Sequence, residues 1–287
     1  MTQNRFGPND ERGAANLIDA AATLRGVAAA GLGRVVPLAL PILNNDRGAG
    51  AEMRAPPQHF MTRHGGDYAA GLPERAGYGY SDDVIMLPTH GATHIDALAH
   101  VWRDGVMYNG YRATEVTSRG AVRCGIDKLG AIATRALFVD FGSDPDSSPE
   151  RVIRAVDLET RIAAAGIVPE PGDALLVRTG WLKAWREGRA SKAATAGLHH
   201  DCASWIVDRG IALVAADNIA VEAIPSGDPE CAMPLHIAVT RDHGVYLAEL
   251  LDLEPLVVHA PRAVMLVIAP LAIRGGVGSP ITPVAIF

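Results

Sequence analysis

Cysteine is scarce in this chain of 287 residues. Its three cysteines, Cys124, Cys202 and Cys231, are widely spaced, odd in number and contain no CxxC pair. Such a set is typical of reduced thiols in a cytoplasmic protein. A chain of this length can bury a sizeable core without disulfides or a structural metal, so the scarcity of cysteine does not limit its stability.

Positive charge and long apolar runs are also lacking. Lysine and arginine number 26 against 32 aspartate and glutamate, which gives a net charge of −6. Nucleic acids and anionic membranes both require a basic surface, so we expect neither as a partner. The longest apolar run, 263–273, is too short to span a bilayer and contains Pro270, so it predicts a buried strand. The polar opening residues predict that no signal peptide is present.

Several enzyme fingerprints are missing from the sequence. No GxGxxG follows a predicted strand, and neither GxxxxGK[ST] nor GxSxG occurs. Dinucleotide binding, P-loop chemistry and the serine-hydrolase elbow are therefore not indicated. The composition, 48% hydrophobic and 20% charged, is that of an ordinary globular protein.

Helical spacings and short apolar runs alternate along the chain. Helices are predicted at 11–30, 156–165, 182–187 and 199–208, and strands at 35–40, 84–87, 137–141, 174–178, 211–216 and 264–269. The strands after residue 83 read as buried, and their alternation with helices predicts an α/β fold with helices covering a sheet. We find no repeat or linker, so we expect a single domain over 1–287 with an N-terminal extension over 1–34.

Histidine, in contrast, is concentrated. His90, His94 and His100 fall within eleven residues, with Asp96 among them. Two imidazoles and a carboxylate suit Zn²⁺, Mn²⁺ or Fe²⁺. On a helix, Asp96 would point about 160° away from His94, whereas an extended backbone puts both on one face. We therefore predict a loop and a short extended segment, with a helix beginning near Asp96.

The number of ligands bears on the kind of metal site. A structural zinc usually has four protein ligands, often cysteines, and no cysteine is nearby. Three ligands with room for water are the catalytic pattern, in which the metal lowers the pKa of its bound water. His100 is of a type that titrates near neutral pH, so it could move a proton, or it could be a third imidazole ligand.

The segment 90–100, HGATHIDALAH, resembles the HxGTHxDxxxH signature of the cyclase family of metal-dependent hydrolases, which includes bacterial-type kynurenine formamidases and isatin hydrolases. Segments 4–17 (NRFGPNDERGAANL), 171–181 (PGDALLVRTGW) and 234–249, which begins PLH and ends LAE, are also similar to family segments. Ala92 stands where the signature has glycine, which predicts a narrower backbone approach beside the metal.

The resemblance implies a fold of the swivelling β/β/α type, with mixed sheets and flanking helices. It also implies a general acid/base, His100, and one or two divalent ions, Mn²⁺ or Zn²⁺, with Asp96 bridging them. The implied metal ligands are His90, His94, Asp96, His236 and Glu249. From the residues alone, His236 could equally be a core or capping histidine, and Glu249 could lie on a solvated face.

Aromatic residues are few but gather around this cluster. Seven of the fifteen lie between Asn44 and Tyr111. The segment 44–80 holds seven glycines and three prolines without a sustained period, so it predicts a lid-like loop. We predict a pocket with ring-stacking walls, although loop packing or a subunit interface would explain the same pattern. The predicted substrate contacts are Phe60, Tyr68, Trp102 and Tyr108.

These features favour metal-dependent hydrolysis of a C–N bond in a small cyclic amide or aryl (form)amide. One alternative is a cyclase or dehydratase acting on a polyketide-like carbonyl substrate, because the same Lewis acid could polarise a carbonyl for ring closure. Another is a non-enzymatic, metal-dependent binding protein. The resemblance further implies a homodimer or homotetramer, with the N-terminal extension or segment 44–80 reaching a neighbour.

Overall fold

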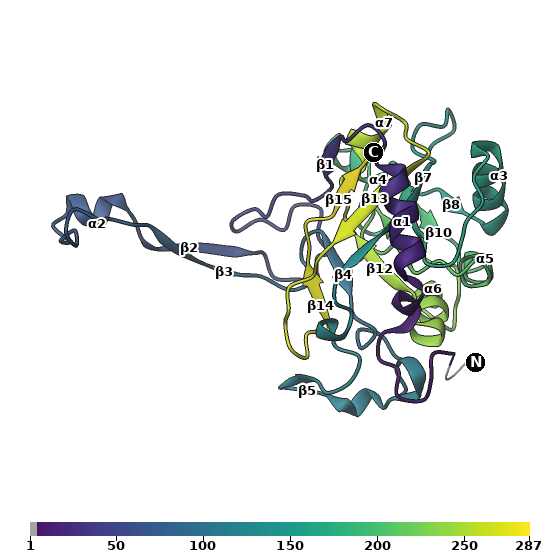
Figure 1. Ribbon diagram of the computed structural model, residues 1–287, viewed down its shortest axis with the longest axis horizontal. Helices are drawn as coiled ribbons and strands as arrows, with labels where there is room; N and C mark the ends of the chain where they lie inside the picture. Colours follow the sequence, from purple (N-terminus) through teal and green to yellow (C-terminus); the bar gives the residue numbers. More distant parts are fainter. Residues whose placement is uncertain (1–4) are drawn as a thin grey trace.

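A computed structural model describes residues 5–287, and Asn4 of the first family-like segment lies outside them (Figure 1). One nine-stranded mixed sheet forms its centre, in the order β1-β15-β13-β7-β9-β11-β12-β4-β14. In that order the strands span Val35–Pro37, Val284–Ile286, Ala263–Ile268, Ile132–Asp140, Ala174–Arg178, Leu213–Ala216, Tyr246–Glu249, His94–Asp96 and Gly278–Pro280. The predicted α/β class with a helix-covered mixed sheet is confirmed.

The middle of the sheet is parallel and both of its flanks are antiparallel. Strands β7, β9, β11 and β12 pair in parallel, whereas the other neighbours in the sheet pair antiparallel. Both faces are covered: Leu175 and Val177 of β9 pack in one core, and Leu176 packs in the other. A strand that is buried on both faces has a continuous run of apolar residues, so the run at 174–178 allowed the bounds of β9 to be predicted correctly.

The first helix covers part of the antiparallel flank. The predicted helix over 11–30 divides into a short 3₁₀ helix, η1 (Gly13–Leu17), and α1 (Ala20–Ala29), which the Asp19 side chain caps by accepting from the Ala22 N–H at 2.9 Å. Helix α1 packs on β7 and β13. A Cβ on Gly26 would lie 2.7 Å from the backbone of Thr134, so this glycine allows the close approach.

The other helices lie around the sheet. Helices α3 and α5 pack against each other and lie together in Figure 1. Helices α2 to α7 span Gly65–Ala69, Ala155–Ala165, Trp181–Arg186, Cys202–Asp208, Pro234–His236 and Glu254–Val257. The 3₁₀ helices η2 to η4 span Tyr108–Gly110, Ala113–Glu115 and Ile126–Lys128, and η5, a π-helix, spans Ile237–Arg241. The minor strands β5, β6, β8 and β10 span Val116–Thr117, Gly120–Ala121, Val152–Ile153 and Gly197–Leu198.

Within residues 5–287, no helix is long and apolar enough to cross a membrane.

The buried strand predicted at 84–87 is wrong in its burial. Residues Asp82–Met86 form β3, which pairs with β2 (Gln58–Arg63) in a hairpin arm, residues 58–86, that projects clear of the body and carries α2 at its tip (Figure 1). All five β3 residues are exposed. An apolar run indicates that its side chains favour burial, but it does not indicate which part of the protein, or of a partner, would cover them.

The helix predicted to begin near Asp96 does not form. Residues 97–100 make a turn in which the His100 N–H donates to the Ala97 carbonyl at 2.9 Å. The Ala97 and Ala99 amides donate instead to the carbonyls of Val277 and Cys124. These long-range bonds fix residues 97–99 against distant segments of the chain, so tertiary contacts override the local tendency.

Candidate metal centre

Strand β4 carries two of the predicted ligands on one face. It lies between β12 and β14, so that His94 pairs with Glu249 and Asp96 pairs with Gly278. Directly paired residues of antiparallel strands project to the same side, and so do residues two apart on one strand. His94, Asp96 and Glu249 therefore face the same space. The predicted extended backbone at His94–Asp96 is confirmed.

Two further histidines approach from outside the sheet. His90 lies on the loop before β4, and its ring packs so closely on Gly278 that a Cβ there would lie 2.4 Å from Nε2. His236 ends α6, in the long connection between β11 and β12. Residues from well-separated parts of the sequence thus converge at the end of the parallel strand β12.

The nitrogen and oxygen atoms of this cluster are close together. Asp96 Oδ1 lies 3.3 Å from His90 Nε2 and 3.6 Å from His94 Nε2, and Asp96 Oδ2 lies 3.7 Å from His236 Nε2. Glu249 lies 3.2 Å from His94 Nε2 and 3.3 Å from His236 Nε2. All five residues are buried, with at most 6% of their surface exposed.

The far side of each imidazole is occupied, which orients the ring. His94 Nδ1 donates to the Ala92 carbonyl at 2.7 Å, and His236 Nδ1 pairs with the Glu222 carboxylate at 2.5 Å. His90 Nδ1 lies 3.1 Å from the Thr89 hydroxyl. In His94 and His236 the Nδ1 proton is held by an acceptor, so Nε2 can offer its lone pair to the cluster.

The cluster fits a divalent cation. His90 Nε2 and Asp96 Oδ1 are buried and have no hydrogen-bond partner among residues 5–287, although they lie close together. A buried polar atom without a partner is costly, and a shared cation would satisfy both. Ligand atoms of His90, Asp96 and His100 lie within 4.8 Å of one another, and so do those of Asp96, His236 and Glu249. Asp96 belongs to both groups. A carboxylate that bridges two metal ions must be shared in this way by both sets of ligands.

Charges in the cluster depend strongly on one another. Burial alone would raise the pKa of Asp96, but the imidazoles of His100, His90 and His94 hold it well below its usual range. Burial opposes the charged forms of Glu249 and His236 as well. The contacts with His236 and His94 nevertheless lower the pKa of Glu249, and the carboxylates of Glu222 and Glu249 raise the pKa of His236. The pKa of His94 is likewise raised by Glu249 and Asp96 against the effect of burial, so without a cation the carboxylates favour protons on His94 and His236.

His100 stacks on His90 with the ring centroids 4.0 Å apart. Burial lowers the pKa of His100 to about 4; the Asp96 charge opposes the shift, and His90 and His236 add to it. The ring is therefore neutral at neutral pH. Its position is compatible with a third imidazole ligand as well as with an acid/base, so both roles of His100 stay predictions.

The cluster opens into a cavity of about 770 Å³, which is large enough for a small molecule. His90, His94, His100, His236 and Glu249 face this space. Most of the remaining wall is apolar and comes from the loop before the arm, the turn after β4, helix α4 and the segments that flank β10 and β11. Its side chains include Met53, Arg54, Val101, Trp185, Lys192, Ile219, Ile224, Met233 and Leu250.

The structure brings none of the four predicted aromatic contacts to this cavity. Phe60 and Tyr68 lie on the hairpin arm, and Trp102 is 50% exposed outside the lining. Tyr108 is buried elsewhere and donates its hydroxyl to Asp10 at 2.7 Å. Proximity in the sequence is a poor guide here because the chain turns away from the cluster on both sides. The aromatic side chain that lines the cavity is Trp185, from α4.

Sequence reasoning also missed Lys192, and the predicted lid lines the cavity only in part. Of the segment 44–80, residues 51–54 line it. Lys192 Nζ donates to the carbonyls of Gly48 and Gly50 at 2.9 and 2.7 Å and so fastens this loop at the cavity rim. No motif marks Lys192, because its role depends on a loop more than a hundred residues away.

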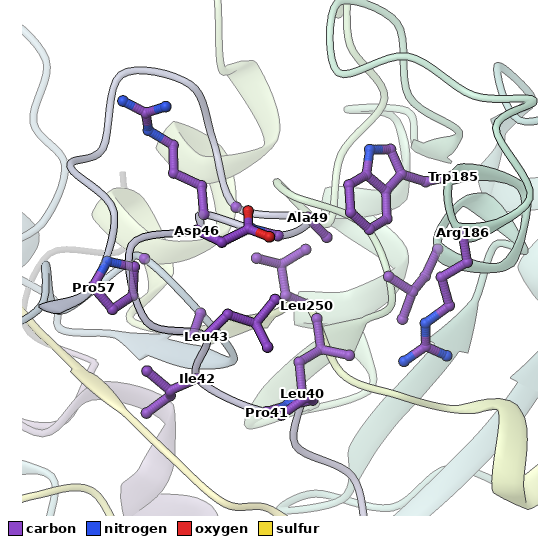
Figure 2. A pocket seen from close by; sticks show the side chains of 16 residues that line it. Leu40, Pro41, Ile42, Leu43, Asp46, Ala49, Pro57, Trp185, Arg186 and Leu250 are labelled. Carbon is purple, nitrogen blue, oxygen red and sulfur yellow. The ribbon is translucent and has the colours of Figure 1, made fainter. Parts of the chain in front are cut away.

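A smaller apolar cavity of about 160 Å³ adjoins the first. Figure 2 shows Leu40, Leu43 and Leu250 around the space that Trp185 borders. Trp185 and Leu250 also line the larger cavity, whereas Gly91 and Ala92 line only the smaller one. The alanine that replaces the signature glycine therefore borders the smaller cavity and not the larger one.

The fold and the cluster define an α/β protein with a candidate divalent-metal centre that can hold one or two ions at the carboxyl end of a parallel strand. The chain belongs to the cyclase family, since the family model described as "Putative cyclase" matches residues 36–223.

Known relatives include hydrolases. An isatin hydrolase of Roseibium aggregatum is 26% identical over 209 residues, which cover 70% of this chain and 73% of that protein. The crystal structure of a novel cyclase has a TM-score of 0.88 at 33% identity and covers 99% of both chains. Isatin hydrolase A from Ralstonia solanacearum, at 20% identity, shares the fold with a TM-score of 0.66 over 93% of this chain and 97% of its own.

We expect Gly278→Ala to weaken cation binding. The added methyl carbon would lie 2.4 Å from His90 Nε2, which is too close, so the His90 ring would have to move. The Mn²⁺ affinity should fall by about 10–100-fold, which is the usual effect of disturbing the orientation of a ligand. Titration calorimetry measures this affinity. The matched control is Gly31→Ala, where a new Cβ meets nothing within 4 Å. Equal affinity in the two variants would show that His90 is not a ligand.

Proposed function

We propose that this protein is a metal-dependent hydrolase that cleaves a C–N bond in a cyclic amide or an aryl (form)amide. The observation that carries the proposal is the buried cluster around Asp96, in which His90 Nε2 and Asp96 Oδ1 face each other without a hydrogen-bond partner among the described residues. Isatin hydrolase, a relative over most of the chain, acts by its name on a cyclic amide. This relationship supports the reaction class and the cyclic substrate.

The cation in this proposal is Mn²⁺ or Zn²⁺. Imidazole nitrogens and carboxylate oxygens without a thiolate suit both ions. His90, His94 and Asp96 would hold one ion, and His236 and Glu249 with Asp96 would hold a second. When bound, such a cation supplies Lewis-acid polarisation of a carbonyl and a water molecule of lowered pKa.

The protein's own groups supply the remaining requirements. Trp185 offers a flat apolar surface on which an aromatic substrate stacks, and Ile219 and Met233 extend the apolar wall. Amide cleavage needs a proton on the departing nitrogen. His100 faces the cavity beside His90 and is neutral at neutral pH, so it accepts a proton from the attacking water and delivers it to that nitrogen.

Metal removal tests the reaction class. We expect the chelator-treated protein to lose its turnover of isatin and N-formylkynurenine, and added Mn²⁺ or Zn²⁺ to restore it. Mass analysis of the product should show one added water. Turnover that survives complete removal of metal would contradict the mechanism, and a product formed by loss of water would indicate a cyclase or dehydratase instead.

His100→Ala tests the proton-transfer role. The variant should retain its bound cation and lose about 10²–10⁴-fold in kcat, the usual contribution of a general acid/base. Elemental analysis measures the retained metal, and His200→Ala, an exposed histidine outside the cavity, is the control. If His100→Ala loses the cation as well, His100 is a ligand.

We also propose that the protein is a homodimer or homotetramer held together through the hairpin arm. The strand register places Phe60, Val84 and Met86 on one face of the arm and Met61 and Ile85 on the other. All five are 47–60% exposed. An isolated two-stranded hairpin is marginally stable in water, so an arm of this kind needs a partner surface. In such an oligomer Phe60 and Tyr68 would contact a neighbouring copy.

Light scattering coupled to size exclusion tests the assembly. The wild type should have a mass that is a multiple of the 30.2 kDa chain, and Phe60→Ser with Val84→Ser should shift it toward one chain. Val258→Ser replaces an apolar side chain of the body that is even more exposed than Phe60 and Val84, and it should leave the mass unchanged. A monomeric wild type would contradict the proposal.

A further inference from the structure

Glu222 is a buried carboxylate that stands behind His236, away from the cluster. Only 1% of its surface is exposed, and it does not line the cavity. Its Oε1 accepts from the His236 amide at 3.0 Å and lies 2.5 Å from His236 Nδ1, while Oε2 accepts from the Leu235 amide at 3.2 Å. One side chain therefore holds both the backbone and the ring of His236.

The position of Glu222 is itself fixed by its neighbours. Asn218 donates its side-chain amide to the Glu222 carbonyl at 3.2 Å. Gly197 lies so close that a Cβ there would be 2.3 Å from the Glu222 carbonyl carbon. These contacts hold the backbone of Glu222, from which its carboxylate reaches His236.

This arrangement distinguishes His236 from the other two imidazoles of the cluster. Its Nδ1 faces a charged carboxylate, whereas His94 Nδ1 faces the Ala92 carbonyl and His90 Nδ1 faces the Thr89 hydroxyl. A carboxylate behind an imidazole fixes the tautomer and makes Nε2 a stronger ligand. His236 Nε2 lies 3.3 Å from Glu249 and 3.7 Å from Asp96, so the effect falls on the half of the cluster formed by these three residues.

We infer that Glu222 is a positioning residue that holds His236 Nε2 toward Asp96 and Glu249 and thereby sets the cation affinity of that half of the site. The inference rests on the proposed metal-dependent function. It assigns a role to a residue that touches neither the cavity nor a bound substrate.

Cation binding to Glu222→Gln tests the inference without an activity assay. Glutamine keeps the shape of the side chain but removes its charge. The affinity for one of the bound Mn²⁺ ions should therefore fall by about 10–100-fold, as measured by competition with a chelator. Glu222→Asp, which retains the charge, should recover part of the loss. The matched control is Asp217→Asn, because Asp217 is an equally buried carboxylate that accepts backbone N–H groups and touches no cluster residue.

The outcomes separate the two proposals. If the wild type binds no divalent cation, the proposed function itself fails. If the wild type binds Mn²⁺ and Glu222→Gln binds every equivalent with the same affinity, the positioning role is overturned. Should Glu222→Gln fail to fold, nuclear magnetic resonance of the Zn²⁺-loaded wild type decides instead. The imidazole proton of His236 must then be on Nδ1, and a proton on Nε2 would overturn the inference.

Discussion

The pairing of β4 between β12 and β14 is the constraint on which the site depends. Only three residues long, β4 aligns His94 with Glu249 and Asp96 with Gly278 through backbone hydrogen bonds. A shift of one residue would turn His94 and Asp96 to the opposite face, because side chains alternate along a strand. The other two imidazoles are added from outside: His90 fits against the bare Cα of Gly278, and His236 is held from behind by Glu222.

The same arrangement concentrates charge where a protein core normally avoids it. Asp96 and Glu249 are buried among imidazoles, and burial opposes the ionisation of both carboxylates. Placing such groups together lowers stability unless something compensates for their desolvation. Such departures from a well-packed apolar core are expected at functional sites, and the donor atoms here suit a divalent cation, which would supply the compensation.

Two kinds of element could be predicted from the sequence: those buried on both faces, and those whose backbone follows from neighbouring side chains. Strand β9 is buried on both faces, so its run of apolar residues sufficed to locate it. The extended backbone of His94–Asp96 followed from a geometric argument about two side chains two residues apart. The run 84–87 is equally apolar, but residues 84–86 belong to β3, in an arm outside the body. The predicted aromatic pocket around His90 to His100 likewise rested on closeness in sequence, and the cavity is lined by Trp185 instead.

The sequence by itself determined the donor types of segment 90–100 and the local backbone that presents His94 and Asp96, because both depend on residues a few positions apart. It also determined the family, through short segments that can each be recognised without knowing how the chain folds. Only the tertiary structure decided which distant groups complete the site. Trp185 of α4 and Lys192 of the following loop line the cavity, and Glu222 from the loop after β11 contacts His236. The order of strands in the sheet sets their proximity. Sheet order arises from packing over the whole chain, and no short pattern in the sequence encodes it.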